Sequence, residues 1–364
     1  MSGSDSRGLG MTGRLLAASA AMAGCLALMM TLAGCGGSGA ADADTVKIGA
    51  YSVVNEVFHD GLIPAFKAKW KEKTGKDIDF QESYQASGAA ARSIVNGFDA
   101  DLAVLSHGGD MESLAKAGKV RSDWAAGPDK GILTNSLVVI GHRAGNPKGI
   151  KDWADLAKPG VGVLYPDPKT SGGARWNINA LYGGAAIAAR KEGQSIEQAT
   201  ADPSVRDLLA KVQVNVVNMD PSGRQSMANF AERETGDAVV TYENEILLRG
   251  KQGKPIEYVV PPATLLIESP VAVVDGSVER HGNRALVEAF LEFLRSAEGQ
   301  KIFADYGFRP VNADVKRPEL PQPTTLFTMA DLGGWARVED VLYGPKGLWT
   351  TIAAERPAAG AQGR

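Results

Sequence analysis

The amino-acid sequence predicts an α/β fold with two lobes, and three observations lead to this prediction. Short apolar runs such as Thr45–Tyr51 are followed by stretches with helical spacing such as Phe58–Lys73. This alternation is typical of a parallel sheet covered on both faces. The chain has 364 residues, which is long enough for two lobes with separate cores. A strand, a tight loop and a helix start follow one another between residues 163 and 184.

The N-terminal segment has the pattern of a targeting peptide. Arg7 and Arg14 precede an uncharged apolar run, Leu15–Ala33, and small residues surround Cys35. Residues 32–35 read LAGC and resemble the lipobox of bacterial lipoproteins, in which the cysteine becomes the lipidated N-terminus. We therefore expect residues 1–35 to be a signal peptide that ends at the lipidated Cys35. A single transmembrane anchor is the alternative, because the same run is just long enough to span a bilayer.

The rest of the chain divides into a linker, two lobes and a tail. We predict a linker at 36–44, a first lobe from 45–135 plus 271–317, a second lobe at 136–270, and a C-terminal tail at 318–364 that packs over the lobes. The expected elements within the lobes are strands Ile78–Glu82 and Leu102–Leu105, helices Ala89–Asn96 and Arg284–Leu294, and the crossover strands Ser136–His142 and Glu268–Asp275.

The loop at Ser171 has the chemistry of an anion site. Ser171, Gly172 and Gly173 precede a stretch with helical spacing, and a helix N-terminus carries free N–H groups and a partial positive charge. The glycines let a ligand approach the backbone, and the serine adds a hydroxyl donor. A simple helix cap is the alternative interpretation of Ser-Gly-Gly alone.

Composition excludes several classes of function. The net charge of −3 lacks the basic excess that nucleic-acid binding needs. Both cysteines, Cys25 and Cys35, fall in the N-terminal segment, so no disulfide or thiol site is expected after cleavage. We expect no metal and no cofactor, and the common hydrolase and nucleotide motifs are absent from the sequence. Glu243 and Glu245 could form a carboxylate pair, but we interpret them as the start of a helix.

The segment PKTSGGARWN at 168–177 closely resembles the anion loop of bacterial sulfate- and thiosulfate-binding proteins. Further similar segments are GNPKGIKDWADLAKPGVGV from Gly145, GDAVVTYENEILL from Gly236, SAEGQKIF from Ser296 and LFTMADLGGW from Leu326. The resemblance implies the fold of a type II periplasmic binding protein, with a ligand cleft between its lobes. It also implies a non-enzymatic binding protein on the periplasmic or extracytoplasmic face, which delivers sulfate or thiosulfate to ABC permease subunits. The lipobox adds the expectation that this protein is a lipoprotein. We expect a monomer.

The resemblance also implies which residues bind the anion through backbone N–H and hydroxyl donors: Ser52, Ser87, Ser171, Gly172, Gly173, Gly223 and Tyr242. Two of these depart from the family, which has aspartate where Ser52 stands and tryptophan where Tyr242 stands. A third departure places His107 after a strand, where we expect a solvated loop residue. The alternatives are a binding protein for another small oxyanion or a sulfonate, or an enzyme on the same fold.

Overall fold

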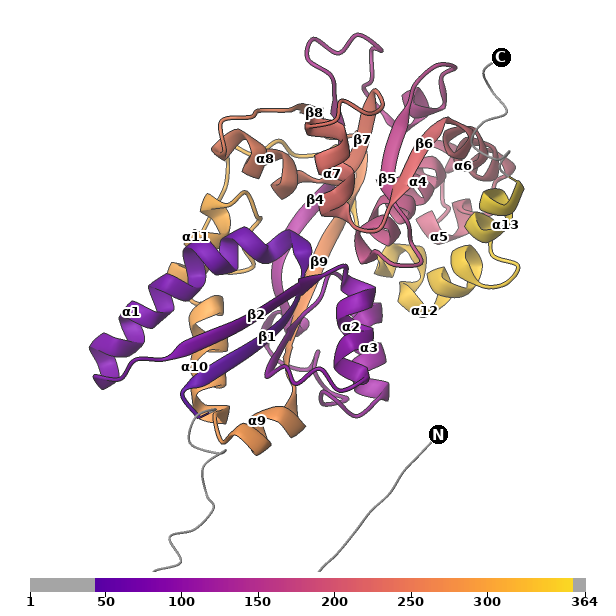
Figure 1. The fold of residues 1–364 in the computed structure, drawn as a ribbon. Helices are drawn as coiled ribbons and strands as arrows, with labels where there is room; N and C mark the ends of the chain where they lie inside the picture. Colours follow the sequence, from indigo (N-terminus) through magenta and orange to yellow (C-terminus); the bar gives the residue numbers. More distant parts are fainter. Residues whose placement is uncertain (1–42, 356–364) are drawn as a thin grey trace, which may run out of the picture. The chain divides into compact units, whose positions relative to one another are not determined.

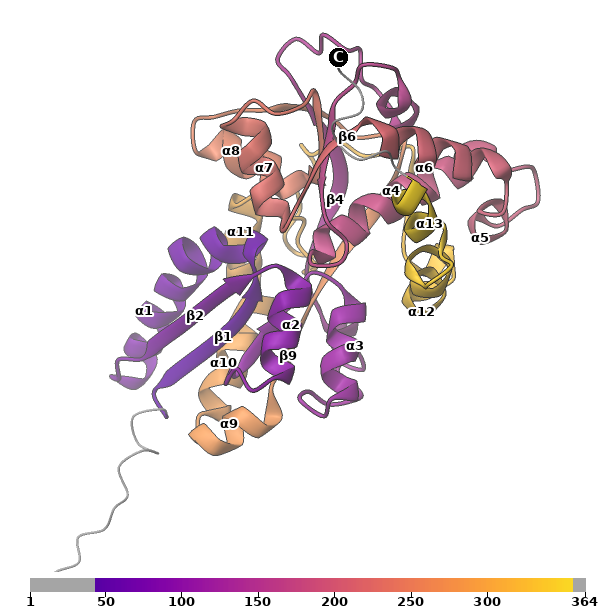
Figure 2. The same cartoon turned by 45° about the vertical axis from the view of Figure 1, so that its right-hand side comes forward.

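The computed structural model describes residues 43–355 (Figures 1 and 2). The predicted signal peptide, the lipidation site Cys35 and most of the predicted linker lie outside the described residues. Among residues 43–355, no helix is long and apolar enough to cross a membrane.

Ten strands of the described part join into one sheet, in the order β2-β1-β3-β9-β4-β7-β5-β6, with β8 beside β4 and β10 beside β9. Their bounds are β1 Thr45–Tyr51, β2 Asp79–Gln85, β3 Leu102–Val104, β4 Ile132–His142, β5 Val163–Pro166, β6 Val216–Asp220, β7 Ala238–Tyr242, β8 Glu257–Val259, β9 Ala263–Val273 and β10 Thr325–Phe327.

The prediction of a purely parallel sheet is wrong at its centre. β1 is parallel to β2 and β3, and β5 is parallel to β6 and β7, as the alternation of strands and helices predicts. β9, however, is antiparallel to both β3 and β4, and β4 is antiparallel to β7. The physical reason is that β4 leads the chain into the second group of strands and β9 leads it back, so these two neighbours run in opposite directions.

The two central strands are longer than predicted. β4 begins at Ile132 rather than Ser136, and β9 begins at Ala263 rather than Glu268. The polar segment Thr134–Ser136 looks like a loop in the sequence, but its backbone pairs with Ile267–Ser269 of β9. β9 changes partner along its length, since residues up to Pro270 pair with β4 and residues from Val271 pair with β3.

Helices cover both faces of the sheet. They are α1 Ile63–Thr74, α2 Ser87–Val95, α3 Gly108–Lys116, α4 Gly172–Ala189, α5 Ile196–Ala199, α6 Pro203–Asn215, α7 Gly223–Ala231, α8 Glu243–Lys251, α9 Asp275–His281, α10 Arg284–Arg295, α11 Ala297–Asp305, α12 Gly334–Val338 and α13 Leu348–Glu355. Short 3-10 and π segments are η1 Ser52–Val54, η2 Val57–Leu62, η3 Pro128–Gly131, η4 Trp153–Ala157, η5 Ala330–Leu332 and η6 Glu339–Tyr343.

The alternation of side chains along each strand separates the core into layers. In β3, Leu102 and Val104 face the cluster that contains Phe66 of α1 and Phe290 of α10. The intervening Ala103 faces α2 and α3 instead. Figures 1 and 2 show α1 and α10 on one side of β1 and β2, with α2 and α3 on the other.

The same alternation organises the second group of strands. Val138 and Ile140 of β4 belong to the cluster that contains Trp176 of α4, whereas Leu137 and Val139 pack with Phe230 of α7 and Ile246 of α8. β10 adds a short parallel strand beside β9, so the C-terminal segment joins the sheet directly. This arrangement places the start of α4, α7 and α8 at the ends of their strands.

Candidate anion-binding site

Most of the strands on either side of the central strands β4 and β9 end shortly before a helix begins. β2 leads into α2, β3 into α3, β5 into α4, β6 into α7 and β7 into α8. Each helix start carries backbone N–H groups without intrahelical partners and about half a positive charge. Contacts between neighbouring starts, described below, show that these helix ends meet.

The start of α4 lies at the centre of these contacts. Ser171 occupies the N-cap position with an extended backbone, yet its side chain makes no cap hydrogen bond. The interpretation of Ser171 as a simple capping residue is therefore not supported by its geometry. The backbone around it is fixed, because the N–H of Ser171 donates to Asp167 O at 2.8 Å and the N–H of Asp167 donates to Asp220 O at 2.7 Å.

The two glycines after Ser171 are packed too closely for a larger residue. A Cβ atom on Gly172 would collide with Ser106 Oγ and lie 2.7 Å from His107 Cδ2. A Cβ on Gly173 would lie 3.2 Å from Ser171 Oγ and 3.8 Å from the hydroxyl oxygen of Tyr242. The start of α4 is thus in contact with the loop after β3 and with the end of β7.

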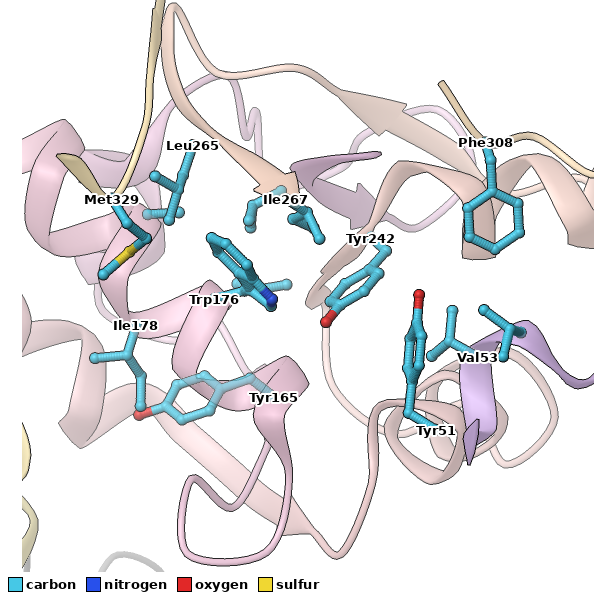
Figure 3. Close-up of a cluster of buried hydrophobic side chains, with 14 of the residues drawn as sticks. Tyr51, Val53, Tyr165, Trp176, Ile178, Tyr242, Leu265, Ile267, Phe308 and Met329 are labelled. Carbon is cyan, nitrogen blue, oxygen red and sulfur yellow. The ribbon is translucent and has the colours of Figure 1, made fainter. Parts of the chain in front are cut away.

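Tyr242 closes one side of this region. It is 3% exposed, and its ring centroid lies 6.5 Å from that of Tyr51 at the end of β1. In the view of Figure 3, Tyr242 lies between Trp176 and Tyr51. Its hydroxyl is buried beside the hydroxyl of Ser106 but makes no regular hydrogen bond within residues 43–355. Burial raises the pKa of this phenol well above its ordinary value, so it stays protonated and can donate.

Ser87 lies at the first position of α2 and connects two loops. Its hydroxyl donates to Asp110 Oδ2 at 2.6 Å and accepts from the N–H of Ser106 at 2.9 Å. A Cβ on the next residue, Gly88, would lie 3.3 Å from Thr170 O, so the starts of α2 and α4 are adjacent.

Ser52 and Gly223 are connected through their neighbours in the chain, since Arg224 donates to Ser52 O at 3.5 Å. Gly223 begins α7, and a Cβ on it would lie 3.9 Å from Val53 Cγ2, next to Ser52. The neighbouring Arg224 donates to Glu56 Oε2 at 2.5 Å and lies 3.2 Å from Glu245 Oε1. The predicted ligand residues therefore gather at one place, although no contact joins all of them.

Three further residues lie here: Ser106 and Asp110, which sequence reasoning missed, and His107, which it assigned to a solvated loop. The expectation that His107 is solvated is wrong, because it is 3% exposed. Its ring stacks on that of Trp335, which is far away in the sequence, and the two ring centroids lie 4.4 Å apart. The one sequence signal that could have found these residues is their position directly after the short strand β3.

The glutamates of the YENE segment have separate structural partners. Both lie in the first turn of α8, which confirms that they begin a helix. Glu243 is paired with Arg309 through two hydrogen bonds of 2.6 and 3.0 Å, whereas Glu245 faces Arg224. The idea of a carboxylate pair is therefore contradicted. Within the described part of the chain, no cluster of three or more His, Cys, Asp or Glu residues is arranged to hold a metal ion.

A large surface hollow lies apart from this region. This hollow of about 920 Å³ is lined by residues of α8, α11 and the following loop, including Leu247, Lys301 and Arg317. None of the predicted ligand residues lines it. The candidate site is instead a set of buried donors at converging helix ends.

Comparison with known proteins identifies the family. A family model described as "Bacterial extracellular solute-binding protein" matches residues 59–309, which is more than half of the chain. The chain belongs to the bacterial extracellular solute-binding proteins. This membership confirms the predicted class, a solute-binding protein of a family that is not enzymatic.

Individual members of this family are similar over most of the chain. The sulfate-binding protein of Synechococcus elongatus is 38% identical over 352 residues, which cover 94% of this chain and 97% of the relative. The thiosulfate-binding protein of Pseudomonas aeruginosa is 33% identical, covering 83% and 90%. The solved structure of the sulfate-binding protein SubI from Mycobacterium tuberculosis has a TM-score of 0.73 and 37% identity, covering 82% of this chain and 99% of SubI. The predicted fold and family are therefore confirmed.

Proposed function

We propose that this solute-binding protein captures sulfate or thiosulfate and delivers it to the permease subunits of an ABC importer. The single observation that carries the proposal is that several helix starts meet around Ser171, Gly172 and Gly173. The buried hydroxyls of Tyr242 and Ser106 lie there without a regular hydrogen bond in the described chain. The names of its curated relatives, sulfate-binding and thiosulfate-binding protein, support the same ligand class.

The proposed binding mode uses donors rather than a counter-charge. The backbone N–H groups of Ser52, Ser87, Gly172, Gly173 and Gly223 and the hydroxyls of Ser171 and Tyr242 are the proposed contacts. Burying a dianion without donors is prohibitively unfavourable, whereas each charge-assisted hydrogen bond contributes about 1.5–3 kcal/mol net. Helix dipoles pointing at the anion add to this without a basic residue. Neither a metal nor a cofactor is needed for this chemistry.

The lobes are proposed to close over the anion. Residues 45–135 with 271–317 act as one lobe and residues 136–270 as the other. Trp176 donates its indole N–H to Ser106 O at 2.7 Å, and Arg224 pairs with Glu56, so both contacts join the two proposed lobes. Residues 318–355 add Trp335, whose ring packs against both His107 and Trp176. Closure of this kind excludes water and strengthens the hydrogen bonds inside.

The ligand is tested by calorimetric titration of the full chain, purified in detergent, with sulfate, thiosulfate, hydrogen phosphate and a small sulfonate. We expect sulfate or thiosulfate to bind with micromolar or higher affinity. Hydrogen phosphate carries a proton that a site of donors alone leaves unpaired, so it should bind more weakly. Saturable binding of only the sulfonate or only hydrogen phosphate would contradict the proposal.

The anchor is proposed to be a lipid on Cys35, which holds a monomer on the extracytoplasmic face of a membrane through residues 36–44. Cys35→Ser should prevent lipidation and release the protein from membranes while leaving its anion affinity unchanged. Cell fractionation and titration of the same preparation measure both effects. Retention of the mutant in membranes through its N-terminus would support the transmembrane alternative.

A further inference from the structure

We propose that Ser106 and His107 also contact the bound oxyanion and help to determine which oxyanion is chosen. The proposal rests on the proposed function and extends its donor set to the loop after β3. Four observations carry it. Both side chains are buried, Ser106 Oγ and His107 Nε2 make no regular hydrogen bond in the described chain, both residues contact Gly172, and the histidine ring is rigidly supported.

Ser106 has a buried hydroxyl without a well-formed hydrogen bond. The residue is 1% exposed, and its Oγ has the hydroxyl of Tyr242 beside it but no regular hydrogen bond among the described residues. This oxygen lies directly against Gly172, where any Cβ atom would collide with it. A buried polar group without a partner costs free energy, and such groups in folded proteins call for an explanation. An anion held at the start of α4 is a partner that fits.

His107 presents a donor whose identity follows from its other nitrogen. The N–H of Asp110 donates to Nδ1 of His107 at 3.2 Å, so Nδ1 is an acceptor and the proton of the neutral ring sits on Nε2. Nε2 is buried and makes no hydrogen bond in the described chain. Asp110 Oδ2 lies 3.2 Å from Nε2 but without the alignment of a hydrogen bond. Burial also lowers the pKa of His107, which favours the neutral ring.

The histidine ring is held in place from two sides. Trp335 stacks on it with an interplanar angle of 20°, and Trp176 meets it edge to face at 82°. Trp176 is itself fixed by its hydrogen bond to Ser106 O. A donor that is already oriented loses little freedom on binding, so its hydrogen bond contributes more to affinity.

Both donors contact Gly172, and the hydroxyl of Ser106 lies beside that of Tyr242. The oxyanion is therefore approached by donors from the start of α4, from Tyr242 and from the loop after β3. A tetrahedral dianion with four equivalent acceptor oxygens can use all of them. Thiosulfate replaces one oxygen by a larger sulfur atom that is a weaker acceptor. Sites built to donate discriminate against a ligand that leaves a donor unpaired, so Ser106 and His107 should favour sulfate over thiosulfate.

The test is calorimetric titration of the full chain with sulfate and with thiosulfate, using the variants Ser106→Ala and His107→Phe. Phenylalanine keeps a flat ring against Trp335 but has no Nε2–H. Matched controls are Ser113→Ala and His59→Phe, which change the same residue types at exposed positions. Melting curves of all variants show whether each one folds.

We expect each site variant to weaken sulfate binding by about tenfold to a hundredfold and to lower the ratio of sulfate to thiosulfate affinity, with both controls unchanged. If the unmodified chain binds sulfate and both site variants bind it equally well, the inference is wrong while the proposed function stands. If the unmodified chain binds neither anion, the proposed function fails and this inference with it. Should His107→Phe not fold, Ser106→Ala decides the outcome alone.

Discussion

Replacing Tyr242 with phenylalanine should change the stability and the affinity of the protein in opposite directions. The hydroxyl of Tyr242 is buried and has no regular hydrogen bond to the rest of the described chain. Its desolvation therefore costs free energy in the anion-free protein, which the neighbouring hydroxyl of Ser106 offsets only in part, and a buried unsatisfied group costs about 1–3 kcal/mol. Tyr242→Phe removes that cost and should raise the free energy of unfolding by about 1 kcal/mol, or the melting temperature by about 2 °C.

The same substitution removes a donor to the bound anion. A hydrogen bond to a charged group contributes about 1.5–3 kcal/mol, so the sulfate affinity of Tyr242→Phe should fall about tenfold to a hundredfold. The assay is differential scanning calorimetry without anion, followed by calorimetric titration with sulfate. With saturating sulfate, the order of melting temperatures should reverse, because the unmodified protein gains more from the ligand.

A matched control is Tyr343→Phe. The hydroxyl of Tyr343 donates to Asn179 Oδ1 at 2.8 Å, so its removal breaks an existing hydrogen bond and should lower stability by about 0.5–1.5 kcal/mol. A Tyr242→Phe variant that melts lower than the unmodified protein without anion, and binds sulfate equally well, would refute the reasoning. A third variant, Tyr242→Trp, should reject hydrogen phosphate more strongly, because an indole donates but cannot accept.

Three further predictions follow from the same region. Ser171→Ala should weaken sulfate binding by about 1.5–3 kcal/mol with an unchanged melting curve, because its side chain makes no cap hydrogen bond; normal affinity in titration would contradict its proposed role. Gly172→Ala forces a methyl group against Ser106, so it should lower the free energy of unfolding by about 1–3 kcal/mol and also weaken sulfate binding. Urea unfolding measures the first effect and titration measures the second. Burial raises the pKa of Glu245 above its ordinary 4.5, although Arg224 acts in the opposite direction. The folded state then binds more protons than the unfolded state, so stability falls as the pH rises above 4.5. Glu245→Gln should therefore be more stable than the unmodified protein at pH 7 but not at pH 4. Urea unfolding measures the difference in free energy of unfolding at each pH. The same difference at pH 7 and at pH 4 would show that burial does not control the pKa of Glu245.

Periodicity predicted the regular elements well where one side of an element is buried. Arg284–Leu294 is an example, since Leu286, Val287, Phe290, Phe293 and Leu294 are buried at helical spacing in α10. Periodicity failed for the first residues of β4, because Thr134 and Asn135 are polar residues that pair within the sheet. Local sequence patterns also cannot predict that β4 and β9 are antiparallel, because this depends on how the chain returns to the first group of strands through β9.

The candidate site was predictable to the extent that it is made from helix starts. Ser-Gly-Gly at 171–173 marks such a start by its residue types, and the structure places α4 there. Ser106 and His107 carry no comparable mark, because their burial depends on Trp335 and Trp176 from other parts of the chain. A single histidine in a glycine-rich loop has the same local sequence whether it is solvated or covered. The ligand roles of all the predicted residues stay predictions, namely those of Ser52, Ser87, Ser171, Gly172, Gly173, Gly223 and Tyr242.

The change of partner within β9 has a consequence for how this protein folds. Leu102 of β3 pairs with Val273 of β9, and Ile267 of the same strand pairs with Ser136 of β4. Both pairings join residues that are far apart in the sequence, and loop-closure entropy makes such contacts slow to form. β9 lies in the middle of the sheet but near the end of the order of strands along the chain, so it is one of the last strands to be synthesised. Until it arrives, the β1–β3 group and the β4–β7 group share no strand, so we expect the nascent chain to complete its sheet late. A chain that folds late is well suited to crossing a membrane before it folds.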